Sequence, residues 1–281
     1  MVALVRSAFL VAATFALSAY QLPSHKDRMF AYPAIVDGSG DDITVDYRKE
    51  RDIYGRDKQP RRKVKDRYIS RGVRWSRKRR TYRSLSGKRL NMFVVGKARQ
   101  PRVSVIYLHG RGGNRRQGVN DWIFGGNFNR LQNLMVKGRG RLYTPDFSGF
   151  GEDGKDDIAG LITKIDRETP NTRLVVACGS MGSKQCWRLA RDPKTGGVID
   201  GMMILGGRWD EKAVGKASFP VVFGHGSLDG TYPVSRQKAF AKTLAKNGQP
   251  VRFVTFRTGV HGTPIRMIDW RTELNWILSQ K

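Results

Sequence analysis

The sequence predicts an α/β domain with three layers, in which helices cover both faces of a mostly parallel central sheet. From residue 103 onward, short apolar runs alternate with segments that have the length and apolar spacing of helices. This alternation is typical of consecutive βαβ units, and strands that are apolar throughout are typical of sheets buried on both faces. At 281 residues, the chain is long enough to form one large domain of this kind.

The first nineteen residues have the features of a secretory signal peptide. Arg6 lies near the start, an apolar run extends from Ala8 to Ala16, and the small residues Ser18 and Ala19 follow. The run is shorter than the roughly 20 residues of a membrane-spanning helix. We therefore expect cleavage near Ala19 and a secreted or periplasmic protein, with an uncleaved membrane anchor as the alternative.

Residues 20–79 are expected to form a basic N-terminal arm, partly extended, that precedes the α/β domain at residues 80–281. The first part of the arm contains prolines, glycines and aspartates without a clear hydrophobic period. Between Arg48 and Arg89, nineteen basic and four acidic residues give a net charge of +15, more than half of the total of +28. Such a concentration of positive charge attracts anionic partners.

Tyr68, Trp75 and Tyr82 are interspersed among these basic residues. Aromatic and cationic side chains together can bind at a layer of lipid headgroups or stack on nucleic-acid bases. No zinc-finger, helix-turn-helix or RNA-recognition signature accompanies them, so we expect no specific reading of nucleic acid. Two interpretations stay open for Arg48 to Arg89: a surface that binds an anionic partner, and a basic face that contacts only water.

The regular elements begin with a hairpin, in which strand-like residues from Thr81 and from Leu90 to Val95 flank a turn at Ser86-Gly87. Apolar runs then predict strands at 103–108, 141–144, 174–178, 201–205, 221–223 and 251–256. Apolar residues at helical spacing between and after these runs predict helices at 128–136, 157–167, 181–191, 234–246 and 264–279.

A predicted strand runs directly into the turn Gly179-Ser180-Met181-Gly182 and then into a predicted helix. Small residues on both sides of a serine allow the backbone to bend sharply and expose the hydroxyl, and the next N–H points to where an oxyanion would form. Ser180 is therefore a candidate nucleophile, although Cys178 stands where such turns usually have glycine. A plain turn between a strand and a helix is the alternative.

Cys178 and Cys186 are the two cysteines of the sequence, one before the candidate nucleophile and one after it. An oxidising compartment would permit a disulfide between them. The axes of a strand and a helix are usually too far apart for such a bond. We therefore expect two buried, unpaired cysteines.

Other predicted strands end in polar or glycine-rich loops. His109, Gly110 and Arg111 begin a loop whose backbone N–H groups can approach a substrate oxygen closely. Three further side chains follow the ends of other strands: Asp146, Asp229 and His261. Because the carboxyl ends of parallel strands meet at one edge of a sheet, we expect functional loops to gather there.

Together and in this order, these motifs resemble the α/β-hydrolase superfamily, in its branch of serine esterases, lipases and peptidases. The resemblance covers roughly residues 80–281 and includes the hairpin, the His-Gly loop, the serine turn and the chain order Ser, Asp, His. It implies that Ser180 is the nucleophile, Asp229 the orienting acid and His261 the general base. The backbone N–H groups of Met181 and Arg111 would form the oxyanion hole.

Several residues have a second interpretation. Asp210, which follows the predicted strand at 201–205, is an alternative acid, because some members of the superfamily take the carboxylate from this earlier strand and not from the strand that precedes Asp229. His225 and His109 are expected to be structural hydrogen-bonding residues, and Asp146 is expected to brace its turn. Residues 207–220 are too few for the large lid that many lipases insert there, so we expect an open site.

The resemblance implies hydrolysis of a carboxylic ester, in a small-molecule or lipid-like substrate, through an acyl-enzyme and without a metal or organic cofactor. A serine peptidase or amidase is an alternative with the same triad. An alternative of another class is a cationic binding protein for anionic lipid, envelope polymer or nucleic acid on a hydrolase scaffold. The sequence makes no prediction of the oligomeric state.

Overall fold

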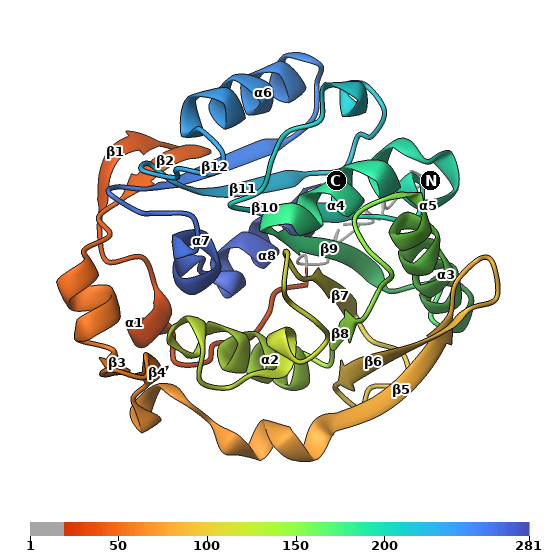
Figure 1. The fold of residues 1–281 in the computed structure, drawn as a ribbon, viewed down its shortest axis with the longest axis horizontal. Helices are drawn as coiled ribbons and strands as arrows, with labels where there is room; N and C mark the ends of the chain where they lie inside the picture. Colours follow the sequence, from red (N-terminus) through yellow and green to blue (C-terminus); the bar gives the residue numbers. More distant parts are fainter. Residues whose placement is uncertain (1–19, 281) are drawn as a thin grey trace, which may run out of the picture.

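The computed structural model describes residues 20–280, so the predicted signal peptide at residues 1–19 lies outside the described residues. Ten strands form one sheet in the order β1-β2-β12-β11-β10-β9-β7-β8-β6-β5 (Figure 1). Their bounds are Ile35–Ser39 (β1), Asp42–Val45 (β2), Arg77–Arg83 (β5), Arg89–Val95 (β6), Val103–Leu108 (β7), Arg141–Pro145 (β8), Arg173–Gly179 (β9), Gly201–Leu205 (β10), Val221–Gly226 (β11) and Val251–Phe256 (β12). A separate small ribbon pairs Asp57–Lys58 (β3) with Lys63–Val64 (β4).

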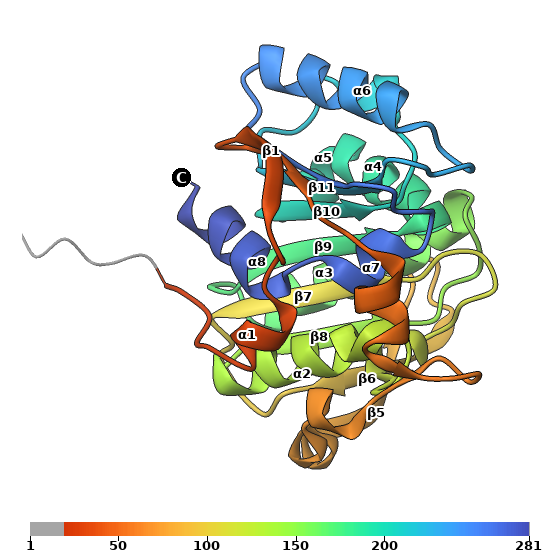
Figure 2. The same ribbon diagram turned by 90° about the vertical axis from the view of Figure 1, so that its left-hand side faces the viewer.

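The α-helices occupy two layers, one on each face of the sheet (Figures 1 and 2). On one face lie α3, α4, α5 and α6, and on the other lie α1, α2, α7 and α8. Their bounds are Asp27–Phe30 (α1), Asn127–Lys137 (α2), Glu152–Glu168 (α3), Ser183–Arg191 (α4), Pro193–Gly196 (α5), Val234–Lys246 (α6), Thr263–Met267 (α7) and Trp270–Ser279 (α8). The predicted fold class is therefore confirmed.

The middle of the sheet is parallel from β2 to β8, and its three antiparallel pairings lie toward the two ends. Strand residues alternate between the two buried layers: Val105 and Tyr107 pack on one side, and Ile106 and Leu108 pack on the other. This alternation follows from the two-residue period of a strand. Because both faces are buried, β7 contains no exposed position, as the continuous apolar run predicts.

The last predicted helix, at 264–279, is divided into α7 and α8. Asp269 lies between them, and its carboxylate accepts hydrogen bonds from the backbone N–H groups of Arg271 and Thr272. An aspartate that accepts such bonds starts a new helix and satisfies N–H groups that have no partner inside it. The sequence pattern of apolar residues does not reveal this break, since it continues through both helices.

Residues 20–79 do not form an arm that is separate from the domain. β2 pairs in parallel with β12, and β1 pairs with β2 to extend that end of the sheet. Ile43 and Val45 of β2 are buried in the same core as the helices of the C-terminal region. The boundary that we expect at residue 80 therefore does not divide the fold, because strands from both sides of it share one sheet.

The basic stretch from Arg48 to Arg89 runs around the outside of α2 before it enters β5 (Figure 1). Part of its charge is already paired, since Arg74 and Arg77 both contact the buried carboxylate of Asp121. The guanidinium of Arg56 is buried and donates a 3.0 Å hydrogen bond to the carbonyl oxygen of Gly125. These residues attach the stretch to the domain rather than serve as free surface charges.

The two end strands of the sheet differ in character. At one end, β5 exposes Lys78, Arg79 and Arg80 to solvent. At the other end, β1 is exposed along its whole length and displays Ile35 and Val36. Within residues 20–280, no helix combines the length and the apolar content that a membrane crossing requires.

Candidate active site

Ser180 occupies a sharp turn between β9 and α4. Its φ angle is 49°, in the left-handed region, which costs a residue other than glycine roughly 1–2 kcal/mol. Such a conformation persists where the surroundings hold it, and it is most common at functional sites. Gly182 makes the turn possible, because a Cβ atom there would lie 2.7 Å from the carbonyl oxygen of Leu108. The turn therefore presents the Ser180 hydroxyl at the carboxyl end of the central strand.

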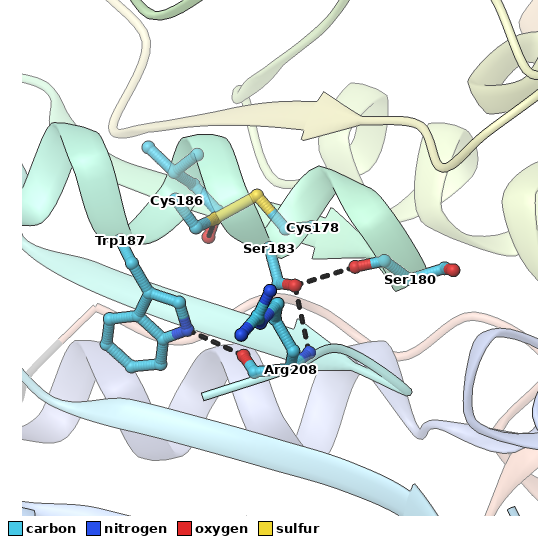
Figure 3. The surroundings of a disulfide bond; sticks show 7 residues. Cys178, Ser180, Ser183, Cys186, Trp187 and Arg208 are labelled. Carbon is cyan, nitrogen blue, oxygen red and sulfur yellow. Dashed lines mark hydrogen bonds between the residues drawn. A yellow bond between two sulfur atoms is a disulfide. The ribbon is translucent and has the colours of Figure 1, made fainter. Parts of the chain in front are cut away.

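The expectation of two unpaired cysteines is wrong. Cys178 and Cys186 form a disulfide, with their Cα atoms 6.3 Å apart (Figure 3). Both side chains belong to the same buried layer, and α4 passes close over the end of β9 directly after the sharp turn. This brings the two Cα atoms within the range that a disulfide permits. Cys178, which stands where a glycine is usual, is thus bonded to Cys186, and the loop that this disulfide closes contains the candidate nucleophile.

Ser180, His261 and Asp229 form one chain of hydrogen bonds. The distance from Ser180 Oγ to His261 Nε2 is 2.7 Å, and His261 Nδ1 lies 2.9 Å from Asp229 Oδ2. A carboxylate only accepts hydrogen bonds, so Nδ1 is the donor to Asp229, and the tautomer with its proton on Nδ1 presents Nε2 as an acceptor to the hydroxyl. This arrangement can remove a proton from the serine and return it to a leaving group.

The carboxylate of Asp229 is fully buried and held from several sides. Its Oδ1 atom accepts hydrogen bonds from the backbone N–H groups of Thr231, at 2.8 Å, and Tyr232, at 3.0 Å. Burial alone would raise the pKa of Asp229, but the hydrogen bonds from His261, Tyr232 and Thr231 outweigh it and lower the pKa below its usual value. Asp229 therefore stays ionised at neutral pH.

Two loops at the carboxyl edge of the sheet bring the acid and the histidine together. The backbone N–H of Leu228 donates to the carbonyl oxygen of Gly259, at 2.8 Å, and links the loop after β11 to the loop after β12. A Cβ atom on Gly226 would lie 2.3 Å from that same carbonyl oxygen. Glycine at position 226 is thus required for this close approach.

The loop after β7 lies directly against the candidate nucleophile. A Cβ atom on Gly110 would lie 2.9 Å from Ser180 Cβ and 3.4 Å from its Oγ. Arg111 and Met181, the predicted oxyanion-hole residues, line the same cavity of about 450 Å³ as Ser180 and His261. The Arg111 Nε atom is 3.2 Å from the sulfur of Met181. The two residues are therefore neighbours at one side of the serine.

Residues that were not predicted complete the wall of this cavity. Phe124, Ile265 and Tyr232 contribute apolar surface, and the ring of Tyr232 lies edge-on to that of His261 with 5.6 Å between centroids. The Gly125-Gly126 pair after Phe124, with both φ angles positive, is a signal in the sequence for an irregular loop. Nothing in the sequence pattern indicates which cavity that loop would line.

Two of the three histidines outside the chain of hydrogen bonds, His109 and His225, have structural partners. His109 donates from Nδ1 to the carbonyl oxygen of Gly110, at 2.9 Å, and stacks on Phe147. His225 is fully buried, and its Nε2 lies 2.8 Å from the carbonyl oxygen of Tyr232. Burial lowers the pKa of both histidines, which keeps them neutral at pH 7. These contacts agree with the structural roles expected for them.

The remaining carboxylates hold loops in place. Asp146 accepts a 2.9 Å hydrogen bond from the backbone N–H of Arg115 and also pairs with its guanidinium, so it braces the loop after β7. Asp210 accepts a hydrogen bond from the backbone N–H of Lys212 and lies 3.4 Å from the Nε of Arg191. The Nδ1 of His261 is bonded to Asp229, so Asp210 does not occupy the position of the orienting acid.

The loop from β10 to β11, which is the place of a lid in many lipases, holds only the short helix η7 (Glu211–Ala213). The site is therefore open on this side, as its length predicts. Within the described part of the chain, no cluster of three or more His, Cys, Asp or Glu side chains is placed to hold a metal ion.

Solved structures with this arrangement of strands and helices include several hydrolases. A thermostable esterase has a TM-score of 0.59 and 18% identity over 74% of this chain, and a candidate α/β hydrolase of unknown function from Agrobacterium tumefaciens has a TM-score of 0.55 and 17% identity over 72%. The chain has the α/β-hydrolase fold. An acylaminoacyl peptidase from Pyrococcus horikoshii with the same fold has a TM-score of 0.54 and 14% identity over 71% of this chain.

The chain spans 64% of the length of the thermostable esterase, 94% of the Agrobacterium protein and 41% of the peptidase. No protein-family model and no curated protein sequence matches it. The α/β-hydrolase fold provides the edge of the sheet at which Ser180, Asp229 and His261 meet, and these side chains decide which chemistry is available.

Proposed function

We propose that this α/β hydrolase is a serine hydrolase that cleaves a carboxylic ester. The observation that carries the proposal is the unbroken chain of hydrogen bonds from Ser180 through His261 to the buried carboxylate of Asp229. The strained φ angle of Ser180 supports it, because such strain at a polar residue is typical of a functional site. The esterases among the structural neighbours support the choice of ester substrates.

In the proposed reaction, Ser180 Oγ attacks the acyl carbon of the ester while His261 Nε2 takes its proton. The oxyanion that forms is stabilised by the backbone N–H groups of Met181 and Arg111. His261 then gives the proton to the alcohol oxygen as the ester bond breaks, which leaves an acyl group on Ser180. Water, deprotonated by His261, hydrolyses that acyl-enzyme and restores the serine.

A fluorophosphonate probe tests the nucleophile directly. The probe is expected to label the folded protein on one peptide, the peptide that contains Ser180, and labelling and esterase turnover are expected to be lost in Ser180→Ala. Ser86→Ala, in the surface turn between β5 and β6, is the matched control and should behave as the unmodified chain does. Labelling that persists in Ser180→Ala, or turnover that is unchanged there, would contradict the proposal.

Amide cleavage uses the same triad, and an acylaminoacyl peptidase is among the structural neighbours. A matched pair of substrates separates the two activities: a p-nitrophenyl ester and a p-nitroanilide with the same acyl group. We expect turnover of the ester to exceed that of the anilide by more than their difference in intrinsic reactivity. Faster relative turnover of the anilide would assign the chain to the amidases.

We further propose that the β5 edge binds an anionic lipid surface. Lys78, Arg79 and Arg80 are exposed there, and Trp75, just before the strand, is 82% exposed. A tryptophan beside several cations is typical of proteins that bind at lipid headgroups, where the ring enters the interface and the cations contact phosphates. This surface would bring an ester hydrolase to lipid-like substrates without reading any nucleic-acid sequence.

Sedimentation with vesicles tests this surface. Binding to vesicles that contain phosphatidylglycerol is expected, with little binding to pure phosphatidylcholine and a steep decrease at high salt. Substituting Gln for Lys78, Arg79 and Arg80 together should weaken binding, while the same change at Lys242 and Lys246 on α6 serves as the control. Equal binding by the two variants would rule out the β5 edge as the membrane contact.

Export from the cytoplasm is also a proposal. The disulfide between Cys178 and Cys186 supports it, because disulfides persist mainly in oxidising compartments. Cell fractionation with determination of the mature N-terminus tests export. A mature protein that begins near Tyr20 in the periplasm or medium is expected, and full-length protein in the cytoplasm would contradict the proposal.

A further inference from the structure

A second hollow, of about 390 Å³, lies between α4 and the loop that follows β10. It is distinct from the cavity at Ser180, and five basic side chains line it: Lys184, Arg188, Arg191, Arg208 and Lys212. We call this hollow the basic cleft. Two acidic residues, Asp210 and Glu211, also line it, so the lining has an excess of positive charge.

The periodicity of α4 explains why so many cations converge. Lys184, Arg188 and Arg191 are spaced by four and three residues, which places them along one side of a helix. The opposite side of α4 is buried through Cys186 and Leu189. The charged side therefore faces away from the sheet and forms one wall of the basic cleft.

Few of these cations are neutralised by the protein. Arg191 contacts Asp210 at 3.4 Å, and Arg188 contacts the exposed Glu152 at 2.8 Å. Lys184, Arg208 and Lys212 make no ion pair with any carboxylate in residues 20–280. Several like charges held around one concave surface repel each other, and an anion that enters would relieve this repulsion.

Hydrogen bonds connect the basic cleft to the nucleophile. Ser183 Oγ donates to the carbonyl oxygen of Ser180, at 2.7 Å, and accepts from the backbone N–H of Arg208, at 3.0 Å (Figure 3). The indole N–H of Trp187 donates to the carbonyl oxygen of Arg208, at 2.8 Å (Figure 3). Arg208 is thus fixed at both its N–H and its carbonyl group, two hydrogen bonds away from the turn that holds Ser180.

An aromatic ring closes one side of the basic cleft. Trp209 lines it, and the guanidinium of Arg236 lies 5.1 Å from the centre of a Trp209 ring. Arg236 belongs to α6, so a cation from that helix lies against Trp209. The indole also adds apolar surface beside the basic side chains of the cleft. A ligand with both a carbon chain and an anionic group would find a matching surface for each part.

We propose that the basic cleft binds an anionic group, a carboxylate or a phosphate, that belongs to the ester substrate. The inference rests on the proposed function and specifies the substrate class for the same site. Arg208 and Lys184 would contact the anion, because the backbone N–H of Arg208 is hydrogen-bonded to Ser183 Oγ and Lys184 follows Ser183 in α4. A guanidinium binds an oxyanion through two parallel hydrogen bonds.

Matched esters test the inference. One series consists of p-nitrophenyl esters of neutral fatty acids, and the other of mono-p-nitrophenyl esters of dicarboxylic acids with the same chain lengths, from six to ten carbons. The unmodified enzyme should prefer the charged series at the lengths that reach the basic cleft. In Arg208→Gln, kcat/KM for the charged esters should fall by about tenfold or more, as the loss of a charge-assisted hydrogen bond implies, while the neutral esters are unaffected.

Lys242→Gln, on the exposed side of α6, is the matched control and should retain the preference for charged esters. A preference that is absent at every chain length, or an equal loss on both series in Arg208→Gln, would overturn the assignment. In the second case the residue would support the active site in general and not a charged substrate.

A binding measurement separates failure of this inference from failure of the proposed function. Calorimetry with Ser180→Ala needs no turnover and uses two probes, adipate and inorganic phosphate. Binding of either probe that is lost in Ser180→Ala/Arg208→Gln supports the basic cleft, and the stronger probe identifies the anion as carboxylate or phosphate. If neither probe binds, the basic cleft is not an anion site even if Ser180 reacts with the fluorophosphonate.

Discussion

Gly110 shows how much the candidate site depends on a single missing side chain. A methyl group added at this position would place its carbon 2.9 Å from Ser180 Cβ, which is well below an ordinary contact between carbon atoms. The φ angle of Gly110 is not positive, so its backbone is compatible with alanine. The added methyl group would therefore press on the candidate nucleophile and on the backbone of Gly179, whose carbonyl oxygen would lie 3.1 Å away.

We predict that Gly110→Ala lowers kcat/KM for a chromogenic ester by about 100-fold, because a small displacement of a reacting group is enough for such a loss. The melting temperature should fall as well, because an extra methyl group in a tight contact costs about 1–3 kcal/mol. Gly72→Ala, at a position where an added Cβ meets nothing within 4 Å, is the control and should leave both quantities unchanged. Activity of Gly110→Ala close to that of the unmodified chain would show that the loop and the serine are not in the contact described.

Glu273, in α8, is a buried acid that does not line the candidate site. Its carboxylate accepts hydrogen bonds from the Arg252 Nε and the Tyr32 hydroxyl, both at 2.8 Å. Burial raises the pKa of Glu273 to about 7, although Arg252 acts in the opposite direction. In the unfolded chain the carboxyl titrates near 4.5, so the folded state binds this proton more tightly.

We predict that the free energy of unfolding decreases as the pH rises from about 4.5 to about 7, with a slope from this residue of at most about 1.4 kcal/mol per pH unit. Below the pKa of Glu273 in the unfolded chain, the bound proton contributes its full stabilisation. This contribution is lost as the pH rises through the pKa of Glu273 in the folded state. Urea denaturation at several pH values should show a shallower dependence in Glu273→Gln. Glu168→Gln, at the exposed end of α3, should keep the original dependence.

At this scale the sequence predicts which polar side chains meet better than it predicts their surroundings. Ser180, Asp229 and His261 each follow a strand with a clear apolar pattern, and the structure brings them into hydrogen-bonding contact. The cavity wall is different, because Phe124 and Ile265 come from a loop and a helix that meet only in the folded chain. A local pattern contains no information on such a meeting.

At the scale of the elements, a single disulfide links β9, the turn at Ser180 and α4. The bond between Cys178 and Cys186 joins the strand before Ser180 to the helix after it (Figure 3). The expectation of unpaired cysteines is wrong because the usual distance between strand and helix axes does not hold for a helix that starts within a few residues of its strand. The short connection makes this pair an exception.

We predict that replacing both cysteines by alanine lowers the free energy of unfolding by about 2–3 kcal/mol, the value for a closed loop of this short length. Urea denaturation measures the change, and a reducing agent should lower the stability of the unmodified chain but not of the double variant. Activity per folded molecule should fall as well, because the bond holds both ends of the turn that contains Ser180. Full stability under reducing conditions would mean that packing alone holds this unit.

At the scale of the whole molecule, the N-terminal segment is part of the core. Ile43 of β2 lies opposite Val254 of β12, more than 200 residues later in the chain. The sequence does not predict this pairing, since β2 is short, follows two glycines and gains its burial only from distant strands. The strands and the longer helices after residue 103 are predictable because each shows its own apolar period.

We predict that Ile43→Ala lowers the free energy of unfolding by about 2–5 kcal/mol, as is usual for a buried large-to-small change. Ile35→Ala, in the exposed strand β1, is the control and should have a small effect. A single cooperative transition is expected in both variants, because β2 and β12 belong to one sheet. A separate early transition in Ile43→Ala would instead indicate that the N-terminal segment unfolds on its own.

The two end strands of the sheet have different consequences when molecules are crowded together. Like charges on the β5 strands of two copies repel each other, which prevents these edges from pairing. The β1 edge carries a single charged side chain, Asp37, and displays Ile35 and Val36, so it is the edge at which an added strand from another copy would dock. Among residues 20–280, aggregation at high concentration should therefore begin at β1, and a charged residue placed there should be the first remedy in a preparation that precipitates.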